Sequence, residues 1–181
     1  GGTAARDKQK WGIVQLMLKK LKRAALGARV PHEKGTAGME TVRMPVPSKV
    51  VLPMQQHIGA PCAPVVKKGD TVQVGTLVGK AGGFVGANIY SGVSGTVTGV
   101  EDIRLSNGRS CPAVTIQPDG LQTVDPAVKP PVVTDKESLI AAVQACGLVG
   151  LGGAGFPTAV KLSPKTPVDT LVINGAECEP Y

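Results

Sequence analysis

The apolar positions of residues 7–26 recur at the spacing of an α-helix. Val14, Met17, Leu18, Leu21 and Ala25 follow one another at i, i+3, i+4, i+7 and i+11, which places them on one helix face. Basic side chains surround this face: Lys8, Lys10, Lys19, Lys20, Lys22 and Arg23. We therefore expect a basic amphipathic helix within residues 1–30. Such a helix can lie on an anionic membrane surface or in a partner's groove, and it can equally pack on the domain that follows it.

From residue 48 the pattern changes to short runs of β-branched and apolar residues separated by Gly and Pro. These runs follow a linker at residues 31–47 and predict a small β-rich module over residues 48–118. The expected strands are Lys49–Pro53, Ala63–Val66, Thr71–Val78, Asn88–Tyr90, Gly95–Val100 and Ala113–Gln117.

A proline-rich linker at residues 119–133 precedes a third pattern, over residues 134–181. Thr134 or Asp135 can cap a helix that runs to Cys146, and Gly147 is placed to end it. The apolar run Thr170–Ile173 predicts a buried parallel strand. The fold class is therefore α+β, with the β-rich module followed by the start of an α/β, Rossmann-like unit.

Composition and charge narrow the classes of function. Aromatic residues make up only 3% of the chain, so the core must be built from Val, Ile, Leu and Ala. The net charge of +7 is concentrated in residues 6–34, where Asp7 and Glu33 are the only acids, and so it does not indicate nucleic-acid binding by the folded part. The four cysteines lie far apart, without a CxxC pair, which predicts reduced thiols in a cytoplasmic protein and no metal site.

An uncharged stretch, Ser138–Val160, is long enough to cross a bilayer. Its second half holds five glycines and Pro157, which argue against a continuous transmembrane helix.

The same glycines form a candidate ligand site. Gly150, Gly152, Gly153 and Gly155 remove side chains from a turn that leads through Phe156 into a helix. Backbone without Cβ atoms can approach a ligand closely, and free N–H groups at the helix start can bind phosphate. Lys161 follows one turn later. Glycine also serves close packing between turns, so this cluster alone leaves both interpretations open.

A second segment favours a nucleotide site. Asn174, Glu177 and Glu179 follow the predicted strand Thr170–Ile173. Polar groups at the carboxyl end of a strand can hold ribose hydroxyls or the polar edge of a base ring. Together the two segments predict a nucleotide site, with no assigned catalytic side chain.

The β-rich module resembles the biotinyl/lipoyl-type barrel-sandwich hybrid. Gly69, Asp70, Val72 and Gly75 match one of its turns, and Ser94–Val97 (SGTV) matches the neighbouring one. Carrier domains of that type present a lysine at a hairpin tip, but the corresponding stretch Ala81–Ala87 has none, and Lys80 precedes it. The resemblance therefore implies a scaffold or docking module rather than a swinging arm.

The two later segments carry a more specific resemblance. GLGGAGFPTAVKL followed by INGAECEPY, with MPVPSKVVLPMQQHIGAPCAPVVKKGD upstream, resembles the C subunit of Rnf-type ferredoxin:NAD oxidoreductase complexes over residues 31–181. The glycine turn is also similar to the NADH-binding flavoprotein subunit of respiratory complex I. Leu151 and Ala176 depart from that second pattern, which has arginine and aspartate there.

The resemblance implies roles for the site residues. The loop glycines Gly150, Gly152, Gly153 and Gly155 and the side chain of Lys161 would hold FMN. Phe156 would lie on the nicotinamide side. Asn174 and Glu177 would bind flavin, and Glu179 would lie near NADH.

The resemblance also implies hydride transfer between NADH and FMN, followed by single-electron transfer to iron–sulfur clusters and ferredoxin. It implies a peripheral subunit on the cytoplasmic side of a membrane electron-transport complex. The chain would be its N-terminal fragment, inactive by itself, with the 4Fe–4S clusters beyond Tyr181. Two alternatives remain. One is a related flavoprotein such as a cobalamin reductase, against which the barrel module argues, and the other is a docking or assembly fragment that binds no cofactor.

Overall fold

The computed structural model describes residues 31, 33–173 and 175. The expected basic helix and the predicted site residues Asn174, Glu177 and Glu179 lie outside the described residues. Residues 43–171 form one compact unit. This unit holds all the secondary structure discussed below.

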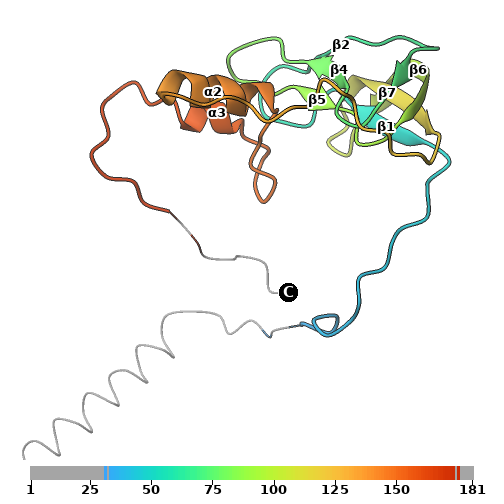
Figure 1. Ribbon diagram of the computed structural model, residues 1–181, viewed down its shortest axis with the longest axis horizontal. Coiled ribbons are helices and arrows are strands. Elements are labelled where there is room, and N and C mark those ends of the chain that lie inside the picture. The colour runs from blue at the N-terminus through green and yellow to red at the C-terminus, as the bar shows by residue number, and fades with distance from the viewer. Residues whose placement is uncertain (1–30, 32, 174, 176–181) are drawn as a thin grey trace, which may run out of the picture. The chain divides into compact units, whose positions relative to one another are not determined.

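In the described part of the chain, seven strands form two antiparallel sheets (Figure 1). The first sheet has the order β1-β7-β6-β3, with β1 at Val50–Pro53, β7 at Ser110–Pro118, β6 at Gly95–Arg104 and β3 at Thr71–Val72. The second has the order β2-β4-β5, with β2 at Ala63–Pro64, β4 at Leu77–Lys80 and β5 at Ile89–Tyr90. The expected single strand Thr71–Val78 is wrong, because Gly75 turns the chain with φ +92° and separates β3 from β4.

A small aliphatic core lies between the sheets. It contains Met54, Cys62, Val72, Val78, Ile89, Val97, Val114 and Ile116, all less than a tenth exposed. In β6 the pattern alternates between buried and exposed from Gly95 to Gly99, as period-2 geometry requires when one face meets a core. The core contains no aromatic side chain, in agreement with the composition.

The two turns that carry the barrel-sandwich resemblance are neighbours in space. Gly69 donates its N–H to Val97 O at 2.8 Å, and Val97 donates back to Asp70 O at 2.9 Å. The Asp70 carboxylate closes its own turn by accepting from Lys67 N at 2.9 Å. The structure therefore confirms the predicted pairing of these turns.

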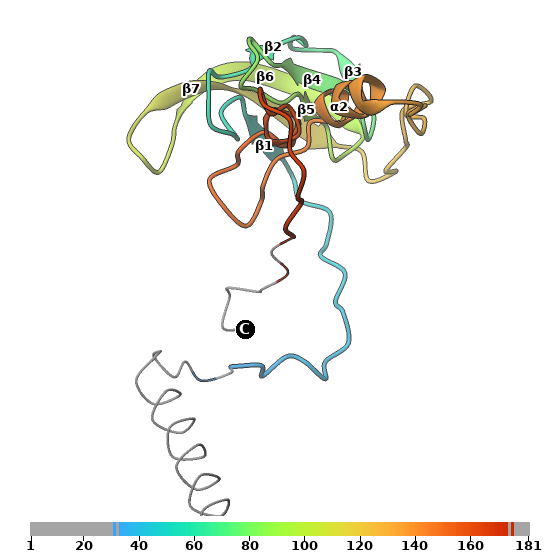
Figure 2. The ribbon, with the colours of Figure 1, turned by 90° about the vertical axis from the view of Figure 1, so that its left-hand side faces the viewer.

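Strands β6 and β7 form a long curved hairpin that ends in a turn at residues 105–109 (Figure 2). The ladder runs from Gly95↔Pro118 to Arg104↔Ser110, with a bulge between Val97 and Gly99. The outer part of this hairpin, from Glu101 onward, is mostly exposed.

The helix α2 spans Lys136–Ala145 and has defined signals at both ends. Asp135 accepts from Ser138 N at 2.7 Å and Ser138 Oγ accepts from Asp135 N at 3.0 Å, which is a capping box. At the other end Gly147, with φ +67°, donates to Gln144 O, and Leu148 donates to Val143 O. This pair of bonds is a Schellman motif, so the predicted glycine stop is confirmed.

The expected Rossmann-like unit is not formed by the described residues. After α2 the described chain contains only the one-turn helix α3, at Thr158–Lys161, and residues 170–173 form no strand. Leu171, Val172 and Ile173 are 82%, 82% and 77% exposed. A parallel strand is stable only with hydrogen-bonded neighbours and covered faces, and the described residues provide neither here.

The uncharged stretch Ser138–Val160 is divided between α2, a turn and α3. Among the described residues, no helix has both the length and the apolar character needed to cross a membrane.

Candidate functional site

Residues 148–158 form a closed turn, here called the glycine loop. Its arms are joined by hydrogen bonds from Thr158 N to Leu148 O at 2.9 Å and from Gly150 N to Phe156 O at 3.0 Å. Gly153 and Gly155 both donate to Gly150 O at 3.2 Å, which closes the tip. The sequence folds this way because Gly155 supplies a φ of +68° where the chain reverses.

The four glycines that the sequence singled out serve two purposes. A Cβ added at Gly152 would meet nothing within 4 Å, and one at Gly153 would meet only Gly150 O, at 3.9 Å. A Cβ on Gly150 would lie 3.5 Å from Lys161 Nζ. In contrast, a Cβ on Gly155 would come within 2.9 Å of Gln56 O. Gly152 and Gly153 therefore leave backbone open to a ligand, Gly150 faces Lys161, and Gly155 serves close packing.

The open tip also carries unused hydrogen-bond donors. The N–H groups of Leu151, Gly152 and Ala154 have no acceptor among the described residues. The Leu151 side chain at this tip is 91% exposed. Successive backbone N–H groups in a turn form a concave cradle for anions such as phosphate.

A cation and an aromatic ring lie beside the tip. Lys161, the last residue of α3, holds its Nζ 5.8 Å from the centroid of the Phe156 ring. The structure therefore brings together Gly150, Phe156 and Lys161, as the sequence predicted.

The start of α3 differs from expectation. The sequence predicted free N–H groups at this helix start, but Thr158 gives its N–H to Leu148 O. Pro157 precedes the helix as its N-cap, with ψ 122°, and offers no N–H. Two of the positions expected to offer donors at the helix start, Pro157 and Thr158, therefore offer no free N–H, whereas three N–H groups of the loop tip have no acceptor in the described chain.

Sequence reasoning missed the surface on which the glycine loop rests. Ile58 of the barrel donates its N–H to Gly155 O at 3.2 Å. Tyr90, in β5, donates its hydroxyl to Ala145 O at the end of α2, and a Cβ on Gly147 would overlap Asn88 O. Figure 1 shows α2 and α3 side by side, near β5. No motif in the sequence connected His57, which follows Gln55 and Gln56, to the glycine loop.

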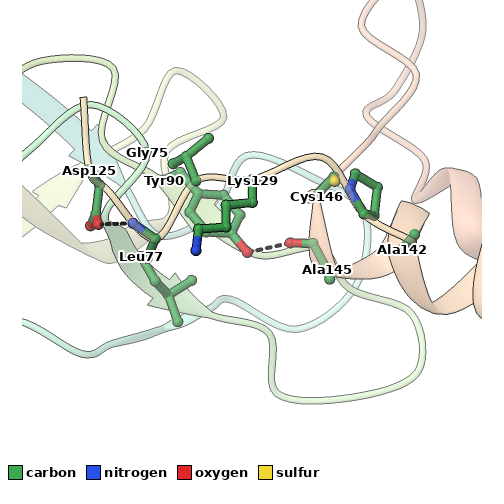
Figure 3. Close-up of a pocket in the computed structure, with 11 residues that line it drawn as sticks. Gly75, Leu77, Tyr90, Asp125, Lys129, Ala142, Ala145 and Cys146 are labelled. Atoms are coloured by element: carbon green, nitrogen blue, oxygen red, sulfur yellow. Dashed lines mark hydrogen bonds between the residues drawn. The ribbon is translucent and has the colours of Figure 1, made fainter. Parts of the chain in front are cut away.

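A cavity of about 590 Å³ lies between β4, β5, residues 125–131 and α2 (Figure 3). Its walls are mostly apolar, and two of its polar side chains, Tyr90 and Asp125, are already paired. Tyr90 bonds Ala145 O, and the Asp125 carboxylate accepts from Ala127 N at 2.9 Å and Thr76 Oγ1 at 2.7 Å. These two bonds hold the pKa of Asp125 below its usual value, and the bond from the Ala127 amide has the larger effect. The open glycines do not line this cavity.

The cysteines do not form a metal site in the described part of the chain. Cys62 and Cys111 are buried and Cys146 is exposed, all as free thiols. No group of three or more His, Cys, Asp or Glu side chains is placed to hold a metal among residues 31, 33–173 and 175. Burial raises the pKa of the Cys62 thiol.

Two family models match the chain. Residues 22–121 match the RnfC barrel sandwich hybrid domain, and residues 143–181 match the Nuo51 FMN-binding domain. The second match contains the whole glycine loop.

Named proteins with similar sequences support both matches. The chain is 49% identical over 140 residues to the C subunit of the Na(+)-translocating ferredoxin:NAD(+) oxidoreductase complex of Acetobacterium woodii, covering 75% of this chain and 32% of that protein. It is 41% identical over 155 residues to the C subunit of the proton-translocating ferredoxin:NAD(+) oxidoreductase complex of Clostridium ljungdahlii (82% and 34%). It is 44% identical over 156 residues to the C subunit of the ion-translocating oxidoreductase complex of Rhodobacter capsulatus (83% and 30%). The chain thus spans about a third of the length of these relatives.

Proposed function

We propose the following function because this chain belongs to the RnfC family: its residues 22–121 match the barrel sandwich hybrid domain of that family. Membership confirms the resemblance to Rnf-type C subunits, and the match to an FMN-binding domain supports a flavin. We propose that the chain, as part of a longer subunit, binds FMN and NADH. In that subunit it would contribute to electron transfer between NAD(H) and iron–sulfur clusters or ferredoxin.

The observation that carries this proposal is the open face of the glycine loop. Cβ positions at Gly152 and Gly153 point into free space, and the tip has N–H groups without acceptors in the described chain. A phosphate-bearing cofactor needs such donors and a nearby positive charge, which Lys161 supplies 3.5 Å from the Cβ position of Gly150. The residues present therefore fit an FMN phosphate.

The remaining contacts are proposed from the family pattern. Phe156 would face the nicotinamide nucleotide, Asn174 and Glu177 would bind the flavin, and Glu179 would lie near NADH. When bound, FMN would supply the conversion between two-electron and one-electron chemistry. The chain's own residues would bind the nucleotides, orient them and neutralise phosphate charge.

The domain limits predicted above remain part of the proposal, with residues 48–118 as a scaffold and 134–181 as the nucleotide-binding part. We propose that the subunit lies on the cytoplasmic side of the membrane, held by other subunits of its complex. The basic segment at residues 1–30 would add contacts to a partner or to anionic lipid.

The test is flavin binding by the full-length subunit. Gly152→Asp places a carboxylate at the open tip, where the fold has room for it. Because like charges repel at short range, we expect the FMN dissociation constant, measured by quenching of flavin fluorescence, to rise about tenfold or more.

Gly92→Asp is the matched control. A Cβ at Gly92 also meets nothing within 4 Å, so the variant adds the same charge outside the glycine loop. We expect its FMN affinity to equal that of the wild type. Equal affinities for all three proteins would show that the glycine loop does not bind the phosphate, and no quenching by the wild type would reject FMN binding.

A further inference from the structure

The short segment Gln56–Gly59 of the barrel, here called the strut, lies between two loops. On one side, a Cβ on Gly155 of the glycine loop would come 2.9 Å from Gln56 O and 3.1 Å from His57 Cα. On the other side, Gly59 has φ +116° and its Cβ would overlap Val85 O in the loop Ala81–Ala87. Both contacts are backbone against backbone, which only glycine permits at this spacing.

A buried side chain fixes the strut. His57 is 6% exposed, and its Nε2 accepts from Ala87 N at 3.3 Å while its Nδ1 donates to Ile58 O at 3.0 Å. An amide N–H can only donate and a carbonyl can only accept, so these partners select the neutral ring with hydrogen on Nδ1. Cys62, 3% exposed, donates its thiol to Ala87 O at 3.2 Å and lies 3.3 Å from Nε2.

The same segment holds the glycine loop. Ile58, whose carbonyl accepts from His57, donates its own N–H to Gly155 O at 3.2 Å. A continuous set of contacts therefore runs from Ala87 through His57 and Ile58 to Gly155. Replacing His57 with an apolar residue would leave the buried Ala87 N–H without its acceptor and remove a donor from the Ile58 carbonyl.

We propose that the strut, locked by His57, holds the glycine loop in its ligand-binding shape, which makes His57 a positioning residue for the flavin site. The expected effect of His57 on flavin binding rests on the proposed function. Its expected effect on the conformation of the glycine loop does not. The barrel would then have a defined role in this chain, because its strut supports the glycine loop. His57 itself would not touch the cofactor.

The alternative is that His57 only stabilises the barrel, and a matched variant separates the two. Ser94 is 1% exposed and donates to Asp119 Oδ1 at 2.6 Å while accepting from Thr123 N at 3.0 Å. Its partners lie in the linker after β7, so Ser94→Ala removes the hydrogen bonds of a buried hydroxyl that does not contact the glycine loop.

The experiment compares His57→Leu, His57→Gln and Ser94→Ala in the full-length subunit. The first measurement is amide hydrogen exchange in residues 147–162 without cofactor, at a fixed interval below each variant's melting temperature. We expect exchange there to be about tenfold faster in His57→Leu, the loss expected when buried hydrogen-bonding groups lose their partners. His57→Gln, which keeps one donor and one acceptor, should lie between His57→Leu and the wild type, and Ser94→Ala should match the wild type.

The second measurement is the FMN dissociation constant. It should be equal in the wild type and Ser94→Ala, higher in His57→Gln and highest in His57→Leu. Equal exchange of residues 147–162 in His57→Leu and Ser94→Ala would overturn the inference. If the wild type binds no FMN, the proposed function fails while the exchange result still decides the role of the strut.

Gly155→Ala serves if His57→Leu does not fold. It pushes the loop off the strut from the opposite side, and we expect faster exchange at the Ile58 amide, with β6 and β7 unchanged. Unchanged exchange at Ile58 would also overturn the inference.

Discussion

The barrel completely buries Met54, Val78 and Ile116, whereas the ten-residue helix α2 has no buried residue. The barrel therefore has the solvent-excluded apolar core that usually dominates stability. The region at residues 134–171, here called the helix–loop region, depends on caps, glycine turns and contacts with the barrel. This difference indicates that the helix–loop region, which is predicted to bind the ligand, is held in its ordered conformation by its contacts with the barrel. Local stability of this kind is typical of binding loops.

The largest effect should come from the barrel core. Ile116 is fully buried, so Ile116→Ala should lower the free energy of unfolding by about 2–5 kcal/mol, through lost apolar contact and the cavity left behind. Because the helix–loop region rests on the barrel, hydrogen exchange should accelerate in both regions. Val51→Ala, at a position 37% exposed on β1, is the control. It should lower the free energy of unfolding, measured with urea, much less than Ile116→Ala does. Exchange that accelerated in the barrel alone would contradict the dependence.

A smaller effect that stays within the helix–loop region should come from Gly147→Ala. Gly147 has φ +67° and no room for a Cβ beside Asn88 O, so the change should cost about 1–3 kcal/mol of local stability. We expect faster exchange in α2 and the glycine loop, with β6 and β7 unchanged. Gly152→Ala, which adds a Cβ in open space, should exchange like the wild type. If Gly147→Ala disturbed β6 and β7 equally, the two regions would be one cooperative unit.

The smallest effect should be the pH dependence of the α2 cap. Hydrogen bonds from the Ser138 amide and then the Ser138 hydroxyl hold the pKa of Asp135 below its usual value. A lowered pKa means that the carboxylate stabilises the fold above its unfolded pKa, and that this stability is lost as the pH falls through the folded value. We expect α2 helicity, followed by circular dichroism, to fall as the pH drops below about 4, the usual pKa of an aspartate.

Asp135→Asn should remove part of that pH dependence, because asparagine caps a helix without titrating. Asp70, Asp119 and Asp125 also have lowered pKa values, so acid should still weaken the turns of the variant. Identical pH profiles for the variant and the wild type would show that the cap contributes nothing to the acid response.

Much of the barrel could be predicted from sequence because its signals are local. The expected strands Lys49–Pro53, Gly95–Val100 and Ala113–Gln117 coincide with β1, β6 and β7, and Asp135 and Gly147 mark both ends of α2. The predicted strand Thr170–Ile173 failed because a parallel strand depends on neighbours distant in sequence. The break at Gly75 was missed because it depends on the glycine's backbone conformation rather than on hydrophobic pattern.

The candidate site could be predicted only in part. The sequence identifies the glycine cluster, but it does not distinguish Gly155, which packs against the barrel, from Gly152 and Gly153, which leave the backbone open. Only the fold reveals that Gly155 meets Gln56, about a hundred positions earlier in the chain. The role of His57 was equally hidden, because its partners Ala87 and Ile58 use backbone groups that any sequence would offer.

The long β6–β7 hairpin has a practical consequence. Its turn at residues 105–109 closes through Leu105 N to Arg109 O at 2.7 Å and Gly108 N to Leu105 O at 2.9 Å, so it is complete without outside contacts. A Cβ at Gly108 would meet only the Arg104 side chain, at 4.0 Å. Exposed turns of this kind tolerate inserted residues. This turn is therefore the place to graft an affinity tag or a dye-labelled cysteine, which would let the protein be immobilised or tracked while the glycine loop stays free.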